Sequence, residues 1–197
     1  AHHTLLLTED WEGAFRAMSS SALPNVPPLY IGKPSASDPS VAPEGDENLF
    51  VLVPSPAKGA QSPGGIDGAG SPRIELYVDR VINQIDAWTG SDIADRVVVR
   101  RTVTSHDLTN QVRTWQGSML GPAHTLRQSA IFRASNRSRK VDGLLFAGSS
   151  TIPGIGVPMC LISAELVLKQ LRGDRSASAL PDSALTDTAL PGTPAVA

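Results

Sequence analysis

The chain contains the stretch GLLFAGSSTIPGIGVP at residues 143–158, and a largely apolar run follows it to Leu171. The apolar residues 144–147 predict a buried strand, and the glycines that follow predict a turn, because glycine permits positive φ angles. Pro158 is typical of the first turn of a helix, since its missing N–H would have no partner there. The sequence therefore predicts a strand, a glycine-rich turn and a helix over 157–172.

A turn of this kind can bring backbone N–H groups against a flat, electron-rich ligand. We expect the N–H groups of Met159, Cys160 and Leu161 to point out of the helix start. The helix dipole favours negative charge at that end by ~0.3–1 kcal/mol per contact. A phosphate or the edge of a reduced flavin would supply this negative charge. The alternative is a tight turn whose glycines serve packing alone, and one glycine motif does not separate the two.

The predicted last helix places Glu165, Lys169 and Arg172 on one narrow polar stripe, so most of its circumference should be buried. Glu165 and Lys169 are spaced for an ion pair. The segment 174–197 is rich in Ala, Ser, Pro and Thr, and we expect it to be a disordered tail.

The rest of the chain mixes short strands and helices. The apolar and β-branched residues predict strands at 5–7, 29–32, 49–53 and 96–104. A short helix capped by Thr8, a long amphipathic helix from Pro72 to near Gly90 and a short helix over 107–115 are also predicted. Residues 55–71 should form a flexible loop. This uneven alternation predicts α+β structure in a substrate domain over 1–100 and α/β structure in a second domain over 101–173.

Composition sets broad limits on the class of protein. The chain has 197 residues, 41% of them apolar, and a formal net charge of -2, so one domain or two small ones can form a core. The single cysteine, Cys160, excludes an internal disulfide and suits a reducing compartment. No apolar run reaches the ~18 residues that a membrane span needs. The first residue is Ala1, followed at once by a strand-like segment, which we interpret as the start of a fragment.

Charge is distributed unevenly. Between Arg100 and Lys140 the only acidic residue is Asp107, whereas acidic residues outnumber basic ones in residues 1–60. A basic block of this kind can face the phosphates of a nucleotide or of a membrane, but a solvated surface is the favoured interpretation. We expect no nucleic-acid partner and no metal site.

Three blocks of the sequence resemble a known family. Residues 147–158 are similar to the C-terminal flavin-binding signature of bacterial phytoene desaturases (phytoene dehydrogenases). These are carotenoid-forming members of the FAD-dependent, amine-oxidase-like group. Residues 34–54 resemble the middle signature of that family, and segments between 117 and 138 resemble a third block. The blocks stand in the order of the family and span about residues 2 to 172.

The resemblance implies the C-terminal part of a two-domain, Rossmann-like FAD-binding flavoprotein. The N-terminal dinucleotide-binding unit, with its Gly-x-Gly-x-x-Gly fingerprint, does not occur in these residues. The implied function is FAD-dependent desaturation of phytoene or a related carotenoid precursor towards lycopene. The implied partners are a long polyene hydrocarbon, a peripheral membrane surface on the cytoplasmic side and the missing FAD-binding portion, without which the isolated fragment should be inactive.

The resemblance also assigns site residues. Gly148, Ser149, Ser150 and Thr151 would line the ribityl and phosphate region of FAD. Gly156 is also among the implied cofactor-binding residues, and Val157, Pro158 and Met159 would lie at the pyrimidine edge of the flavin. Many relatives in the wider group carry an acidic residue where this chain has Ser149.

Catalytic residues are less well defined. His124, Arg127 and Gln128 are the polar candidates near substrate or flavin, and Arg133 or Arg137 could reach an FAD phosphate. For each of them, fixing a loop is at least as good an interpretation, because a hydrocarbon substrate offers no hydrogen bonds.

Three further points remain open from the sequence. Trp11, Phe15 and Met18 share a helix face that could touch lipid, although core packing is the favoured interpretation. A carotenoid ketolase or another polyene oxidoreductase of the same group is an alternative function. An inactive truncated product that needs a separate FAD-binding partner is another.

Overall fold

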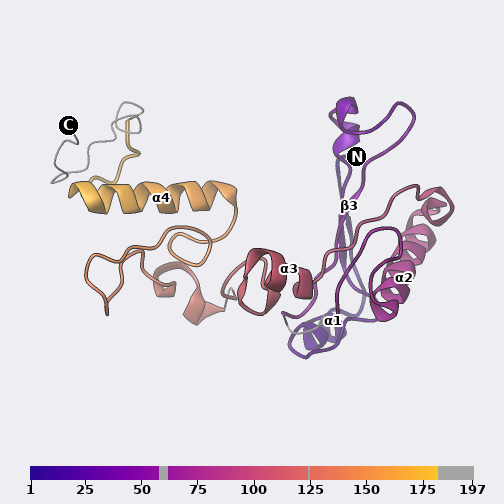
Figure 1. The fold of residues 1–197 in the computed structure, drawn as a ribbon, viewed down its shortest axis with the longest axis horizontal. Helices are drawn as coiled ribbons and strands as arrows, with labels where there is room; N and C mark the ends of the chain where they lie inside the picture. Colours follow the sequence, from indigo (N-terminus) through magenta and orange to yellow (C-terminus); the bar gives the residue numbers. More distant parts are fainter. Residues whose placement is uncertain (58–61, 124, 182–197) are drawn as a thin grey trace. The chain divides into compact units, whose positions relative to one another are not determined.

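The computed structural model describes residues 1–57, 62–123 and 125–181. The chain divides into two compact units, Ala1–Met119 and Leu120–Ala197. The first unit holds the sheet and the helices α1, α2 and α3, and the second holds α4 (Figure 1). The structure thus mixes helices with a small sheet, in line with the predicted α/β and α+β class.

The sheet of the first unit has three antiparallel strands in the order β1-β2-β3. They are β1 (His3–Leu6), β2 (Leu29–Gly32) and β3 (Phe50–Leu52). Leu5 lies opposite Tyr30, which lies opposite Leu52 on the far strand, so these three residues form one row. Because side chains alternate between the two faces of a sheet, the neighbouring row of Thr4, Ile31 and Val51 lies on the other face.

The hydrophobic core lies between that other face and helix α2 (Pro72–Thr89). Leu29 and Ile31 of the sheet pack with Val81 and Ile85 of the helix, and all four are buried. The remaining residues packed against this cluster are Leu6, Val51, Val53, Tyr77 and Ile93. The helix starts at Pro72 and ends at Gly90, whose φ of 70° is left-handed, as the sequence predicts.

Tyr77 ties α2 to the connection that precedes β2. Its hydroxyl donates to the carbonyl oxygen of Pro24 over 3.0 Å. Burial raises the pKa of Tyr77 to about 12, so the side chain remains a neutral donor at physiological pH.

The glycine-rich segment before α2 is bonded to the chain beyond it. Thr102 N–H donates to Gly65 over 2.8 Å, and Asp67 N–H donates to Arg100 over the same distance. A Cβ at Gly64 would lie 2.1 Å from the Thr102 carbonyl oxygen, so this close approach requires glycine. Residues 64–67 are therefore bonded to residues 100–107. The flexibility expected of the loop 55–71 stays a prediction, and residues 58–61 of that loop lie outside the described residues.

The prediction of a strand at 96–104 is wrong. A short 3-10 turn, Ile93–Arg96, opens this stretch, and the only bridge in it joins Arg101 to Ile66. Val98 and Val99 are exposed. β-branched residues favour strands through the neighbours that they pack against, and the described part of this unit provides no second strand here.

Helix α3 (Ser105–Val112) starts earlier than predicted and carries a capping box. The Asp107 carboxylate accepts bonds from the backbone and hydroxyl of Thr104 at 2.8 and 2.9 Å. It also accepts the N–H of Gly64 at 2.9 Å, which links the helix to the glycine-rich segment. Asp107 therefore lies in the first turn of α3, two residues after the helix starts.

Helix α1 (Trp11–Met18) differs from the prediction in its capping residue and in the exposure of its apolar face. Asp10, rather than Thr8, caps the helix by accepting the N–H of Gly13 at 2.8 Å. Trp11 and Phe15 contact each other with ring centroids 6.3 Å apart, yet both are exposed. The favoured core-packing interpretation of this face is therefore wrong, and the buried residue of α1 is Ala14.

The described part of the second unit consists of short 3-10 turns, two isolated bridges and helix α4 (Val157–Arg172). The strand predicted at 144–147 is wrong, because this stretch pairs only through an antiparallel bridge between Leu145 and Arg137. Leu144 and Phe146 are exposed rather than buried. Strand formation requires a partner over several residues, and the stretch 144–147 has a single bridge in the described residues.

Helix α4 has the predicted bounds, but its predicted burial is wrong. Val157, Leu161, Ile162 and Leu171 are exposed, and the buried residues are Ser163 and Lys169. The Lys169 ammonium lies 3.6 Å from Glu165, as the spacing predicts.

The residues after α4 fold back along the helix. The Lys169 ammonium donates to the carbonyl oxygens of Ser176 and Ser178, and Leu180 N–H donates to Glu165 over 2.7 Å. The segment 174–180 is therefore attached to α4, whereas the remainder of the expected tail, 182–197, lies outside the described residues.

Within the described residues, none of the helices combines the length and apolar character needed to cross a membrane.

We expect Ile85→Ala to lower the free energy of unfolding of the full chain by about 2–5 kcal/mol, because the side chain is 2% exposed. Leu76→Ala on the same helix removes a side chain that is 68% exposed and should change the free energy of unfolding by no more than about 0.5 kcal/mol. Urea unfolding followed by circular dichroism measures both values. Equal effects of the two variants would contradict this location of the core.

A second prediction concerns pH. Burial alone would raise the pKa of Asp107, but hydrogen bonds from Thr104, Gly64 and His106 outweigh burial and hold the pKa below its ordinary value. A depressed folded-state pKa adds stability above the unfolded value, and this stability is lost as the pH falls through the folded pKa. Asp107→Asn should therefore destabilise the chain at pH 7 and reduce its loss of stability in acid.

Urea unfolding midpoints at neutral pH and between pH 4 and pH 2 test both effects on stability. The exposed Asp95→Asn serves as the matched control. A variant at position 107 that loses as much stability in acid as the unaltered chain would rule out the assignment.

Candidate functional site

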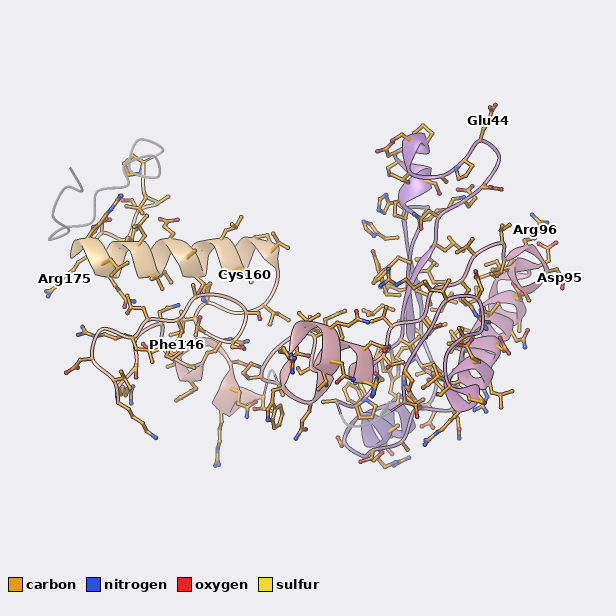
Figure 2. The ribbon with its side chains drawn as sticks, viewed as in Figure 1. Glu44, Asp95, Arg96, Phe146, Cys160 and Arg175 are labelled. Carbon is orange, nitrogen blue, oxygen red and sulfur yellow. The ribbon has the colours of Figure 1, made fainter. Side chains whose placement is uncertain are left out.

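The glycine-rich turn 148–156 leads into helix α4 in the second unit. Figure 2 shows Cys160 on the first turns of the helix and Phe146 on the segment that precedes the turn. The φ angles of Gly148, Gly154 and Gly156 are 114°, 153° and 99°. A Cβ would meet no atom within 4 Å at Gly148 or Gly154. These glycines are therefore required by backbone conformation rather than by lack of space.

The turn is supported by a buried hydroxyl. Ser163 of α4 is 0% exposed, and its Oγ accepts the N–H of Gly148 over 3.0 Å. The same oxygen accepts the Asn136 amide at 2.9 Å and lies 3.0 Å from the hydroxyl of Thr151. The first residue of the turn, the buried Thr151 and the helix are thus joined at one atom.

Asn136 extends this support to both sides of the turn. Its amide nitrogen lies within hydrogen-bond distance of the carbonyl oxygens of Phe146 and Ile152 at 3.0 and 3.1 Å. It also lies 3.2 Å from the Thr151 hydroxyl. Backbone bonds reinforce the arrangement, since Phe146 N–H donates to Asn136 over 2.7 Å and Ile152 N–H donates to Ala134 over 3.0 Å.

Arg133 clamps the same turn from another direction. Its side chain is buried, with the residue 5% exposed, and Nε donates to the Thr151 carbonyl oxygen over 3.1 Å. The two terminal nitrogens donate to the carbonyl oxygens of Ser149 and Gln128. The guanidinium is therefore engaged by the backbone, which supports the loop-fixing interpretation of Arg133 over contact with a phosphate.

We call Arg133, Asn136, Thr151 and Ser163 the turn support. Sequence reasoning placed Thr151 on the ligand side, but both its hydroxyl and its backbone are engaged within the turn support. Ser163 was missed, although a small polar residue inside an apolar helix is a signal that could have drawn attention to it. A buried hydroxyl requires partners, and the structure supplies three.

The start of α4 offers fewer free donors than the sequence predicts. Cys160 N–H donates to Gly156 over 2.9 Å, so its predicted freedom is wrong. Only the first four N–H groups of a helix lack an intrahelical partner, and Leu161 lies beyond them, so its N–H is not free either. No side chain caps this end, and Pro158 has no N–H, so Val157 and Met159 are the residues of the first turn whose N–H groups lack an intrahelical partner.

The polar catalytic candidates do not form a cluster with the turn in the described residues. Arg127, Gln128 and Arg137 are exposed, and Gln128 contributes only its carbonyl oxygen to Arg133. His124 lies outside the described residues. Across 1–57, 62–123 and 125–181, His, Cys, Asp and Glu side chains form no group of three or more that could hold a metal ion.

Comparison with known proteins gives several related sequences. The carotenoid 3,4-desaturase of Haloarcula japonica is 45% identical over 174 residues, which cover 88% of this chain and 34% of the relative. The zeta-carotene-forming phytoene desaturase of Myxococcus xanthus is 33% identical over 171 residues, 86% of this chain and 32% of the relative.

A more distant example is the 4,4'-diapophytoene desaturase (4,4'-diaponeurosporene-forming) of Staphylococcus aureus strain Newman. It is 31% identical over 175 residues, which cover 87% of this chain and 34% of the relative. The chain thus spans about a third of the length of the curated relatives that it matches. No family model matches the chain.

The turn support generates a prediction. Ser163→Ala removes the acceptor of the Gly148 N–H and should destabilise the chain by about 1–3 kcal/mol, because a buried donor is left unsatisfied. Amide hydrogen exchange at Gly148 should become faster. Gln170→Ala, at an exposed position of the same helix, serves as the control. Unchanged exchange at Gly148 would show that Ser163 does not hold the turn.

Proposed function

Because this chain belongs to the family of carotenoid and phytoene desaturases, we propose that it forms the C-terminal part of an FAD-dependent desaturase. The proposed reaction is the dehydrogenation of phytoene or a related carotenoid precursor towards lycopene. The observation that carries the proposal is the identity of 45% over 88% of the chain to a carotenoid 3,4-desaturase. The activity is assigned to the longer protein, because the chain spans about a third of its relatives.

The turn 148–156 and the start of α4 fit one edge of a flavin nucleotide. Gly148, Gly154 and Gly156 have positive φ angles and add no side chain to the turn, and residues 156–158 at the start of the helix are exposed. The N–H groups of Val157 and Met159 belong to the first turn of a helix that no side chain caps, and partial negative charge is favoured at such an end. These features support a cofactor surface built from backbone rather than from charged side chains.

Within this proposal, the site residues have two roles. Gly148, Ser149 and Ser150 would contact the ribityl and phosphate region, while Gly156, Val157, Pro158 and Met159 would contact the pyrimidine edge. Thr151 would act through the turn support, since its polar atoms are engaged there. Arg133 and Asn136 would hold the turn in shape and so position the contacting residues.

FAD, when bound, supplies the acceptor for the hydrogens that leave the substrate. The chain would contribute orientation and exclusion of water. The pyrophosphate cradle, which in this type of fold is a Gly-x-Gly-x-x-Gly turn, would come from residues outside this chain. The polyene substrate and attachment to the cytoplasmic face of a membrane are parts of the same proposal.

The names of the reported relatives favour desaturation over the ketolase alternative, because all three are desaturases. An isolated chain that needs its FAD-binding partner remains compatible with this function, since activity is assigned to the longer protein.

In the complete enzyme, Gly156→Val should prevent flavin loading while the helix content stays unchanged. The φ of Gly156 is 99°, which a β-branched residue does not adopt without strain, although the nearest atom to a Cβ is 4.0 Å away. Gly173→Val is the control, because it places the same side chain at another position of positive φ, 69°, at the other end of α4.

The flavin absorbance of the purified variants and their circular dichroism give the result. Loss of flavin in the Gly173 variant as well would assign the effect to general strain. Full flavin content in the Gly156 variant would overturn the placement of the cofactor at this turn.

A further inference from the structure

The chain contains the dipeptide Asp-Gly at residues 67–68 and again at residues 142–143. The backbone nitrogen of a residue that follows an aspartate can attack the side-chain carboxyl and close a five-membered ring. Glycine hinders this attack least, because it has no Cβ and leaves the backbone free to adopt many conformations. Both pairs are therefore candidates for a covalent change that needs no other protein.

Both pairs occupy the two central positions of a tight turn. The turn 141–144 is closed by a bond from its last N–H to its first carbonyl oxygen over 3.4 Å, and the turn 66–69 by the same bond over 3.0 Å. The second central residue is a glycine with positive φ in each turn, at 74° for Gly143 and 86° for Gly68. Sequence and position in the turn therefore do not distinguish the two pairs.

The surroundings of Asp67 restrain it. Its φ of 49° is left-handed. Its N–H donates to the carbonyl oxygen of Arg100, and its Oδ1 accepts the N–H of Arg100, both over 2.8 Å. The carboxyl group of Asp67 must break this bond before its carbon can meet the nitrogen of Gly68.

Asp142 has none of these restraints. It is exposed, and its φ is not left-handed. Among the described residues, its carboxylate accepts no hydrogen bond and forms no ion pair, and the N–H of Gly143 has no acceptor. A Cβ at Gly143 would meet no atom within 4 Å, so the space around the pair is open. The nucleophile and the carboxyl carbon are thus both free to move together.

We propose that Asp142 is a site of spontaneous succinimide and isoaspartate formation. The nitrogen of Gly143 attacks Cγ of the protonated Asp142 carboxyl, so that a C–N bond forms and a C–O bond breaks. The carboxyl hydroxyl leaves as water with the proton of the N–H. Water then opens the ring at the main-chain carbonyl, and the chain continues through Cγ. The net change is an isomerisation, and it consumes no oxidant or reductant.

The product lengthens the main chain of the turn 141–144 by one methylene group. The closing bond of the turn spans the altered residue and is the first to be affected. Behind it, Ser138 N–H donates to Leu144 over 2.9 Å, and an antiparallel bridge joins Arg137 to Leu145. The modification site is therefore the tip of a short ladder that leads back to Asn136 of the turn support.

The test ages the full 197-residue chain at neutral pH and physiological temperature, in water enriched in the heavy isotope of oxygen. Opening of the ring places this isotope in the new carboxyl group, and mass spectrometry of proteolytic peptides locates it. Fragmentation by electron transfer distinguishes isoaspartate from aspartate. A second sample aged in urea is the reference, because unfolding removes both turns and the bond between Asp67 and Arg100.

In the folded chain, we expect isoaspartate at Asp142 to form at least about tenfold faster than at Asp67, because the bond to Arg100 adds to the barrier. In urea the two rates should become similar. Asp142→Glu keeps the charge at an exposed position and should abolish the signal there, since the longer side chain must close a larger ring. The rate at Asp67 should not change in this variant, which far-ultraviolet circular dichroism checks for folding.

The urea sample makes a negative result decisive. If Asp142 reacts in urea but not in the folded chain, the turn protects the pair and the inference is wrong. Equal rates at the two positions in the folded chain, or a faster rate at Asp67, would equally overturn it. Isotope that remains in the same peptide of the Asp142→Glu variant would assign the change to another residue.

Discussion

The hydroxyl of Ser163 is the point at which the second unit is held together. One oxygen atom joins helix α4 to the start of the glycine-rich turn, to the hydroxyl of Thr151 and to the amide of Asn136. In a buried, low-dielectric environment such bonds are strong, and the loss of one member leaves the others costly to bury. The conformation of the turn depends on this arrangement, because the described unit has only isolated bridges in place of a sheet.

The elements that sequence predicted well are those encoded locally. Helix α2 combines Pro72 at its start, apolar residues at helical spacing and Gly90 at its end, and all of these signals lie within the helix or next to it. The same holds for α4 and for strand β2, which lies between turn residues. The strands expected at 96–104 and 144–147 failed because a strand is completed by a partner, which the residues of the strand do not encode.

The candidate site shows the same division. The glycines and Pro158 are visible in the sequence, because conformations with positive φ and helix starts have residue preferences. The bond from Gly148 to Ser163 and the three carbonyl oxygens around Arg133 arise from contacts between residues 5 to 18 positions apart, which local residue preferences do not specify. Arg133 was considered for a phosphate since its charge is visible in the sequence, whereas the backbone that engages it is not.

The attachment of residues 174–180 to α4 has a practical consequence for handling the protein. Lys169 is buried, and two backbone carbonyl oxygens and Glu165 complete its surroundings. Cutting the chain directly after Gly173, or fusing an affinity tag there, would strip an ammonium group of two acceptors in a place with little access to water. Expression vectors should therefore retain the sequence at least through Leu180 before any linker begins.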